Sequence, residues 1–113
     1  MPAPRSALSG SAMASSVLFT RAAEHDRDVI VDYLLEKLQS RQAAERFLDE
    51  LERLIGVLEE LPESFPCAQD RSLAALDLRK APCLNYFVLY RAEGDTVHLM
   101  RIFHQSQGCA RLV

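Results

Sequence analysis

Asn85–His104, which reads NYFVLYRAEGDTVHLMRIFH, is the stretch that decides the fold. Two apolar runs, at residues 86–90 and 97–103, lie on either side of a polar break at residues 92–95. β-Branched and aromatic residues on both sides of the Gly94-Asp95 turn signal predict an antiparallel β-hairpin. Both runs are apolar at almost every position, so we expect the hairpin to be central in a sheet and covered by helices.

Two helices are predicted before the hairpin. A β-strand candidate at residues 16–20 leads into the first helix, which Thr20 can cap and which extends to about Gln39. Its first turns hold three acidic residues, which are favourable near a helix N-terminus: Glu24, Asp26 and Asp28. After a short break, apolar residues recur at three- and four-residue steps from Ala44 to Leu61, and Pro62 ends this second helix. So short a connection predicts an antiparallel pair of helices.

The rest of the chain completes the predicted domain. Residues 62–75 are expected to form a loop, and the alternation at residues 76–79 predicts a strand that ends in Lys80. The order β-α-α-β-β-β indicates an α+β fold, with an antiparallel helical hairpin on one face of a small twisted, mostly antiparallel sheet. Residues 1–15 show no periodicity and are expected to be a disordered arm or tag, whereas residues 16–113 form a single domain.

Charge is distributed unevenly along the 113 residues, whose formal net charge is −3. Residues 21–65 hold 12 Asp and Glu against 6 Lys and Arg, and residues 66–113 hold 4 against 6. The helical half is therefore acidic and the sheet half mildly basic. An excess of two positive charges permits an anionic partner but is weak for a nucleic-acid-binding surface.

The composition excludes several classes of protein. Cys67, Cys83 and Cys109 are odd in number and widely spaced, and they match no metal or redox motif. We interpret them as reduced thiols of a cytoplasmic protein. No apolar run approaches the roughly 20 residues needed to span a bilayer, and there is no glycine-rich phosphate loop. We therefore expect no metal, no cofactor and no membrane contact.

The hairpin and the residues after it resemble the C-terminal part of the RelE/ParE superfamily, the small toxins of bacterial toxin–antitoxin pairs. The matching elements are Tyr90-Arg91, Gly94-Asp95, Arg101, Ile102-Phe103, His104, and a tail with Gln105-Ser106 and Ala110-Arg111 that is similar to the ParE branch. The resemblance covers about residues 17–113. It implies two helices packed on one face of a twisted sheet, with an antitoxin wrapped around the other surfaces.

One branch of this superfamily consists of ribosome-dependent ribonucleases, which turn the 2′-hydroxyl of a messenger RNA nucleotide onto its own phosphate. That reaction needs a base, an acid and cations around the phosphorane. The resemblance implies that Arg79 and Arg101 match the basic strand positions and that His104 occupies the place of an acid or base. Two departures weigh against this set: no Tyr or Arg directly follows His104, and Lys80 is the only lysine in the region.

The ParE branch instead inhibits DNA gyrase, trapping it on cleaved DNA, and needs a contact surface rather than a catalytic set. Candidates for contact with a target or partner are then Lys80, Arg91, Arg101 and Arg111. The alternative is that Arg101 is structural and pairs with Asp77 or a C-terminal carboxylate. His104 can likewise cap the end of a strand by hydrogen bonding.

We favour a ParE-like toxin that acts on gyrase and forms a hetero-oligomer with a cognate antitoxin. The antitoxin is expected to lay an extended or helical segment along an apolar groove. An endoribonuclease that acts on the ribosome and messenger RNA is the first alternative, and an inactive toxin fold that serves only as a binding module is the second.

Overall fold

The computed structural model describes residues 15–67, 71 and 75–106. Its elements, in chain order, are strand β1 (Ser16–Phe19), helix α2 (Arg21–Asp32), the π-helical turn η1 (Tyr33–Lys37), helix α3 (Arg41–Glu60), and strands β2 (Arg79–Cys83), β3 (Tyr86–Glu93) and β4 (Thr96–His104). The predicted β-α-α-β-β-β order and α+β class are confirmed. The predicted arm lies outside the described residues except for Ser15, which is buried and donates its N–H to the Glu59 carbonyl at 2.7 Å.

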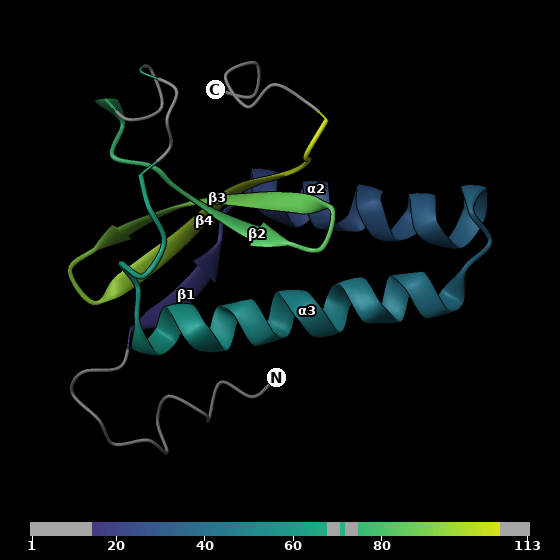
Figure 1. Cartoon of the computed structure of the whole chain (residues 1–113), viewed down its shortest axis with the longest axis horizontal. Helices are drawn as coiled ribbons and strands as arrows, with labels where there is room; N and C mark the ends of the chain where they lie inside the picture. The colour runs from purple at the N-terminus through teal and green to yellow at the C-terminus, as the bar shows by residue number, and fades with distance from the viewer. Residues whose placement is uncertain (1–14, 68–70, 72–74, 107–113) are drawn as a thin grey trace.

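The four strands form one sheet in the order β1-β4-β3-β2 (Figure 1). The β3–β4 hairpin is central, as predicted; it pairs antiparallel with β2 on one side, and its β4 strand pairs parallel with β1 on the other. Gly94 adopts a φ of 62° in the hairpin turn, a conformation in which only glycine escapes a Cβ penalty. Farther along, Leu89 pairs with Arg101 but Tyr90 pairs with Leu99, so β4 carries one extra residue in a bulge.

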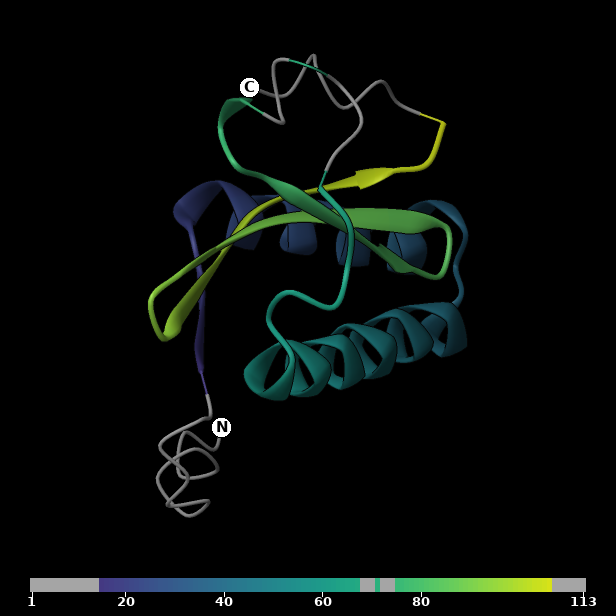
Figure 2. The same ribbon diagram turned by 60° about the vertical axis from the view of Figure 1, so that its left-hand side comes forward.

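Helix α3 lies beneath the twisted sheet and α2 runs behind it at the level of β4 (Figure 2). The predicted apolar stripe of α3 faces the sheet and buries five side chains: Ala44, Phe47, Leu51, Leu54 and Leu58. They pack against Val88, Tyr90, Val97, Leu99 and Ile102 of the central hairpin. Burial of one such leucine contributes roughly 1.5–3 kcal/mol, so this layer holds the domain together. A second cluster, of Leu78, Leu89 and Phe103 with Phe87 and Met100, packs apart from these helices.

One predicted boundary is wrong, and one predicted helix changes its type part-way. The strand expected at residues 76–79 begins instead at Arg79 and runs through Pro82 to Cys83, and Asp77 sits in a turn with φ 61°. An edge strand tolerates proline because the missing N–H faces away from the neighbouring strand. The helix expected to extend to about Gln39 reaches Lys37, but it is α-helical only to Asp32 and π-helical, as η1, over Tyr33–Lys37.

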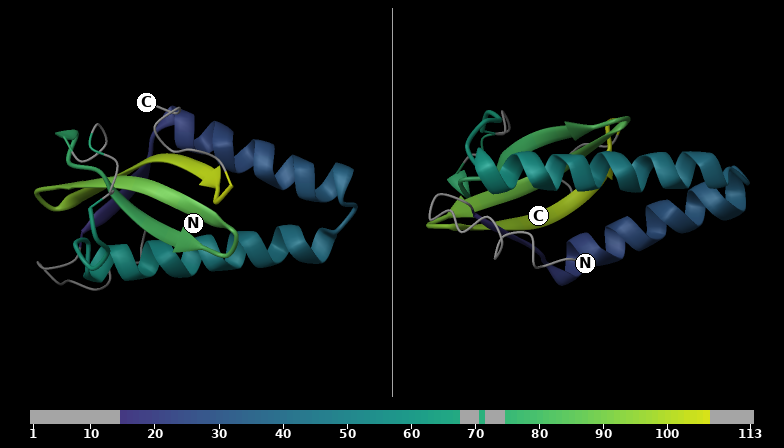
Figure 3. Two further views of the ribbon diagram at one scale, coloured as in Figure 1. Left: turned by 45° about the horizontal axis from the view of Figure 1, so that its top comes forward. Right: turned by 90° about the horizontal axis from the view of Figure 1, so that it is seen from below.

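The far ends of the two helices project past the sheet, where the chain turns back (Figure 3). Ser40 caps α3 by accepting a hydrogen bond from the Ala43 N–H at 3.0 Å, and Gln39 ends the preceding helix with a φ of 48°. The helical hairpin therefore overhangs the end of the sheet formed by the β2–β3 turn and the end of β4. No helix within the described part of the chain is both long and apolar enough to cross a membrane.

Candidate functional site

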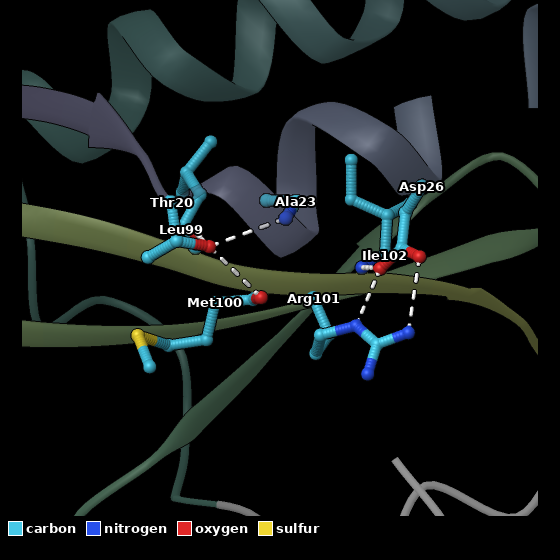
Figure 4. A network of polar contacts seen from close by, with 7 residues as sticks. All are labelled: Thr20, Ala23, Asp26, Leu99, Met100, Arg101 and Ile102. Atoms are coloured by element: carbon cyan, nitrogen blue, oxygen red, sulfur yellow. Dashed lines mark hydrogen bonds and ion pairs between the residues drawn. The ribbon is translucent and has the colours of Figure 1, made fainter. Parts of the chain in front are cut away.

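A cluster of hydrogen bonds joins the start of α2 to β4, and we call Thr20, Asp26 and Arg101 the polar cluster (Figure 4). Arg101 donates from Nε and Nη2 to the two carboxylate oxygens of Asp26, at 2.7 and 3.1 Å. Asp26 Oδ2 also accepts the Ile102 backbone N–H at 2.9 Å. The Thr20 hydroxyl lies 2.8 Å from the Leu99 carbonyl. One carboxylate thus satisfies three donors of a single strand, in the bidentate geometry that makes such pairs strong.

The sheet topology explains why β4 needs these partners. β1 pairs with β4 only over residues 96–99, because the chain leaves the sheet after Phe19 and enters α2. Beyond that point no strand of the described residues lies beside the outer edge of β4, and buried backbone groups must find other partners. Thr20, whose side chain also caps α2 through the Ala23 N–H at 3.2 Å, and Asp26 supply them. Helix α2 therefore continues the edge bonding that β1 begins.

Arg101 is thus held mainly by Asp26, whose side chain is 11% exposed against 26% for Arg101. The hydrogen bond to this carboxylate raises the pKa of Arg101 above its ordinary value, with burial opposing the shift. The sequence-based expectation that Arg101 pairs with Asp77 is wrong: Asp77 lies in the turn before β2, whereas Asp26 approaches the β4 edge from α2. The alternative partner, the C-terminal carboxylate, lies outside the described residues.

Arg79, the first residue of β2, binds the loop that follows α3. Its Nη1 donates to the Phe65 carbonyl at 2.7 Å, and the Lys80 N–H donates to the Pro66 carbonyl at 3.2 Å. Tyr90 lies opposite Arg79 in the β2–β3 register, and its side chain is fully buried. Burial raises the pKa of the Tyr90 hydroxyl, an effect that the Phe65 backbone and the Arg79 charge partly oppose.

The remaining cations predicted for partner contact lie on other parts of the sheet. Lys80 Nζ lies 4.4 Å from the centre of the Phe87 ring, a cation–π contact beside the second apolar cluster. Arg91 Nη2 lies 3.5 Å from a Glu93 carboxylate oxygen near the hairpin turn, and His98 Nε2 lies 3.9 Å from the same oxygen. Arg111 is outside the described residues.

His104 lies at the end of β4, at one side of an apolar groove of about 960 Å³. Its ring stacks edge-on against Tyr86 with centroids 5.3 Å apart, and Tyr86 in turn meets Phe47 at 5.2 Å. His104 Nδ1 lies 2.8 Å from the Ser106 hydroxyl, so the predicted role as a hydrogen-bonded strand end agrees with this geometry. The groove runs between this aromatic row and the overhanging ends of the helices.

The groove is apolar and open. Most of its lining is contributed by aliphatic and aromatic side chains: Val29, Ile30, Tyr33, Leu34 and Leu38 on one side, Ala43 and Phe47 on α3, and Leu84 and Tyr86 on the other side. Arg46, Asn85, His104 and Ser106 complete it. Val29 and Tyr33 are each 50% exposed and Leu38 is 54% exposed. Large apolar side chains gathered in one exposed hollow are typical of an interaction surface.

Comparison with known proteins identifies the family. The family profile described as "ParE toxin of type II toxin-antitoxin system, parDE" matches residues 17–108. This chain belongs to the ParE toxin family. No curated protein matches its sequence. The assignment therefore rests on the family profile, whose match includes the β3–β4 hairpin.

Solved structures share the fold of this ParE-family chain. The chromosomal ParDE system from P. aeruginosa aligns with a TM-score of 0.66 at 16% identity, covering 82% of this chain and 98% of that one. The toxin–antitoxin complex RelBE2 from Mycobacterium tuberculosis aligns at 0.58 and 22% identity, with 86% and 98% covered. YafQ from E. coli strain BL21(DE3) aligns at 0.53 and 13% identity, with 81% and 94% covered.

The ParE-family fold does not bring the three predicted ribonuclease residues together. Arg79 pairs with Tyr90 and His104 with Tyr86, four residues apart on β3, which is about 13 Å along a strand. Arg101 pairs with Leu89 of the second apolar cluster, so its side chain leaves β4 on the face of the sheet opposite to that of Arg79 and His104. From there it reaches Asp26 at the outer edge of β4. The described residues also contain no group of three or more His, Cys, Asp or Glu side chains that could hold a metal ion.

Sequence reasoning missed Asp26 as the partner of Arg101, and it expected an apolar groove without locating it. Asp26 was interpreted only as a favourable charge near a helix N-terminus, because nothing in the linear pattern relates it to a strand 75 residues away. The groove had a visible signal: Val29, Tyr33 and Leu38 follow helical spacing on a helix that also has Ala23 and Leu34 to bury. An apolar stripe wider than one packed face indicates a second surface.

Proposed function

We propose that this ParE-family chain is a growth-inhibiting toxin that binds DNA gyrase, and that a cognate antitoxin neutralises it by occupying the apolar groove. The observation that carries the choice against a ribonuclease is the dispersal of Arg79, Arg101 and His104. Acid–base catalysis of phosphoryl transfer needs its groups within hydrogen-bond reach of one phosphate. Here each of the three has a separate structural contact.

A gyrase inhibitor that acts by contact needs no such convergence. Its requirements are an exposed surface and a stable fold, and the sheet offers cationic side chains at well-separated points for a macromolecular target: Lys80 beside Phe87, and Arg91 near the hairpin turn. Such rim charges steer association and set orientation more than they add affinity. This arrangement supports a binding function in which no single residue is indispensable.

The groove supports the antitoxin part of the proposal. Both of its sides depart from regular backbone: η1 is a π-helical turn, a feature found frequently at functional sites, and Leu84 is held at a φ of 57°. A bulky side chain rarely adopts that conformation, and such strain clusters at binding sites. Because the hollow is apolar and Arg46 and His104 are its basic side chains, it fits an apolar segment that carries an acidic residue.

The deciding experiment compares the two targets. The purified chain is incubated with gyrase and supercoiled DNA and, separately, with translating ribosomes. We expect trapped gyrase–DNA cleavage complexes and intact message. Cleaved message with unaffected gyrase would overturn the proposal in favour of the ribonuclease. No effect on either target, together with normal growth when the chain is expressed without antitoxin, would leave only the inactive binding module.

A further inference from the structure

We propose that the ion pair between Asp26 and Arg101 positions α2 so that the helical side of the apolar groove is correctly placed for its partner. This inference rests on the proposed function of the groove. Asp26, Ile30 and Tyr33 follow one another at steps of four and three residues, so they lie on one face of the helical segment. Asp26 bonds to β4, whereas Ile30 and Tyr33 line the groove.

Packing alone holds α2 weakly. Ala23 is its single buried residue, whereas α3 buries five residues along its length. Val29 is 50% exposed, and Ile30 is only partly buried against the core. A helix that buries so little apolar surface gains little from the hydrophobic effect. Besides the partial burial of Ile30 and Val31, its attachment to the sheet therefore depends on the hydrogen bonds of Thr20 and Asp26 at its start.

The geometry amplifies small movements at this attachment. Tyr33 follows Asp26 by seven residues, which is about 10 Å along a helix. A rotation of about 10° at the ion pair would therefore move Tyr33 by about 2 Å. A shift of that size changes the width of a groove whose other side, at Leu84 and Tyr86, is fixed to the sheet. Loss of the ion pair thus alters the groove without altering any side chain that lines it.

The thermodynamic consequence is a coupling between the ion pair and the partner. If the paired arrangement of α2 is the one that binds, then a variant that populates other arrangements must spend part of the binding free energy to restore it. Couplings of this kind change affinity by roughly 5- to 150-fold. A role confined to overall stability would instead leave the affinity of the folded fraction unchanged.

The test uses the full chain and, as the binding probe, its proposed cognate antitoxin. Asp26→Asn keeps an oxygen that can accept the Ile102 N–H but removes the charge, Arg101→Met removes the other partner, and the double variant completes a cycle. Glu50→Gln is the matched control, since Glu50 forms a similar bidentate pair with Arg53 at 2.8 and 3.2 Å on the exposed side of α3. All measurements are made where every variant is fully folded.

We expect each single variant to bind the probe about tenfold more weakly, the double variant to be no worse than either single one, and Glu50→Gln to match the wild type. Hydrogen exchange should become faster in residues 21–32 and stay unchanged in residues 41–60. Wild-type affinity in Asp26→Asn and Arg101→Met, or exchange that rises equally in both helices, would overturn the inference.

The proposed function can fail separately. If the wild-type chain does not bind the probe, the antitoxin assignment of the groove is contradicted. The exchange measurement needs no partner and then decides the positioning role by itself: faster exchange confined to α2 supports it, and unchanged exchange overturns it.

Discussion

The polar cluster and the apolar groove share one helical segment, yet they differ in what they leave exposed. At Asp26 an acidic side chain, which sequence patterns place on a surface, is 11% exposed and accepts three hydrogen bonds. Two turns later Tyr33, an aromatic residue of the kind expected in a core, is 50% exposed. The cluster resembles the interior of a protein, and the groove resembles an interaction surface. Within this segment Asp26 has a structural contact with β4, and our proposal gives the exposed Tyr33 a role in recognition.

The strongest test of this comparison is to remove the Asp26 carboxylate. Asp26→Ala leaves Arg101 without its main partner and deprives the Ile102 N–H of its acceptor. We expect a loss of about 2–3 kcal/mol in the free energy of unfolding, because the abandoned groups are partly buried. Urea denaturation measures it. Asp28→Ala is the control: that exposed pair with Arg27 at 3.1 Å should contribute at most about 1 kcal/mol. Equal losses in the two variants would mean that the polar cluster is only a surface feature.

The second prediction concerns the groove. Leu38→Glu should weaken binding of the antitoxin about 10- to 100-fold, as expected when a charge replaces an apolar contact at the centre of an interface. Stability should change little, because Leu38 is 54% exposed. Calorimetric titration gives the affinity. Leu48→Glu provides the matched control, since Leu48 is 40% exposed but lies on α3 outside the groove. Equal binding by the two variants would place the antitoxin elsewhere.

A third prediction tests whether the strain at Leu84 serves binding. Leu84→Asn should stabilise the chain by about 1 kcal/mol, because asparagine tolerates a positive φ that costs other residues roughly 1–2 kcal/mol. The same change removes an apolar side chain from the groove and should weaken antitoxin binding. Thermal unfolding and titration on the same samples measure both effects. A variant that is neither more stable nor weaker in binding would show that the φ of 57° at Leu84 neither strains the chain nor serves antitoxin binding.

The sequence was sufficient for the fold because the fold depends on local patterns. The two apolar runs and the turn signal around Gly94 specify the hairpin, and the apolar spacing from Ala44 to Leu61 specifies α3. Where a boundary depended on tertiary context, prediction failed: Pro82 is permitted because β2 is an edge strand, and sheet order is not visible in a linear pattern.

The site was less predictable for a related reason. The cations of a possible active site could be listed from the resemblance, but their separation depends on which strand pairs with which and on which face each side chain begins. The partner of Arg101 illustrates this limit of linear reasoning. A carboxylate 75 residues away, on a helix reached after β1, competes with every acidic residue in the chain. Only the position of α2 against the unpaired edge of β4 selects Asp26.

The smallest predicted effect tests whether the sheet side of the groove stays closed. Cys83 pairs with Tyr86 at the end of β2 and is 3% exposed. Burial raises the pKa of its thiol from 9.0 to about 11. The unfolded chain therefore ionises this thiol first, so the free energy of unfolding should begin to fall as pH rises above about 9, by less than roughly 1.4 kcal/mol per pH unit. Below that pH the thiol is protonated in both states and contributes nothing.

The tyrosines with raised pKa values, Tyr86 and Tyr90, also lower the free energy of unfolding as pH rises, but mainly above about 10. Between pH 9 and 10 the slope therefore comes mainly from Cys83, and Cys83→Ala should remove most of it in urea titrations. A slope of unchanged size after the substitution would show that it does not arise from a buried Cys83 thiol.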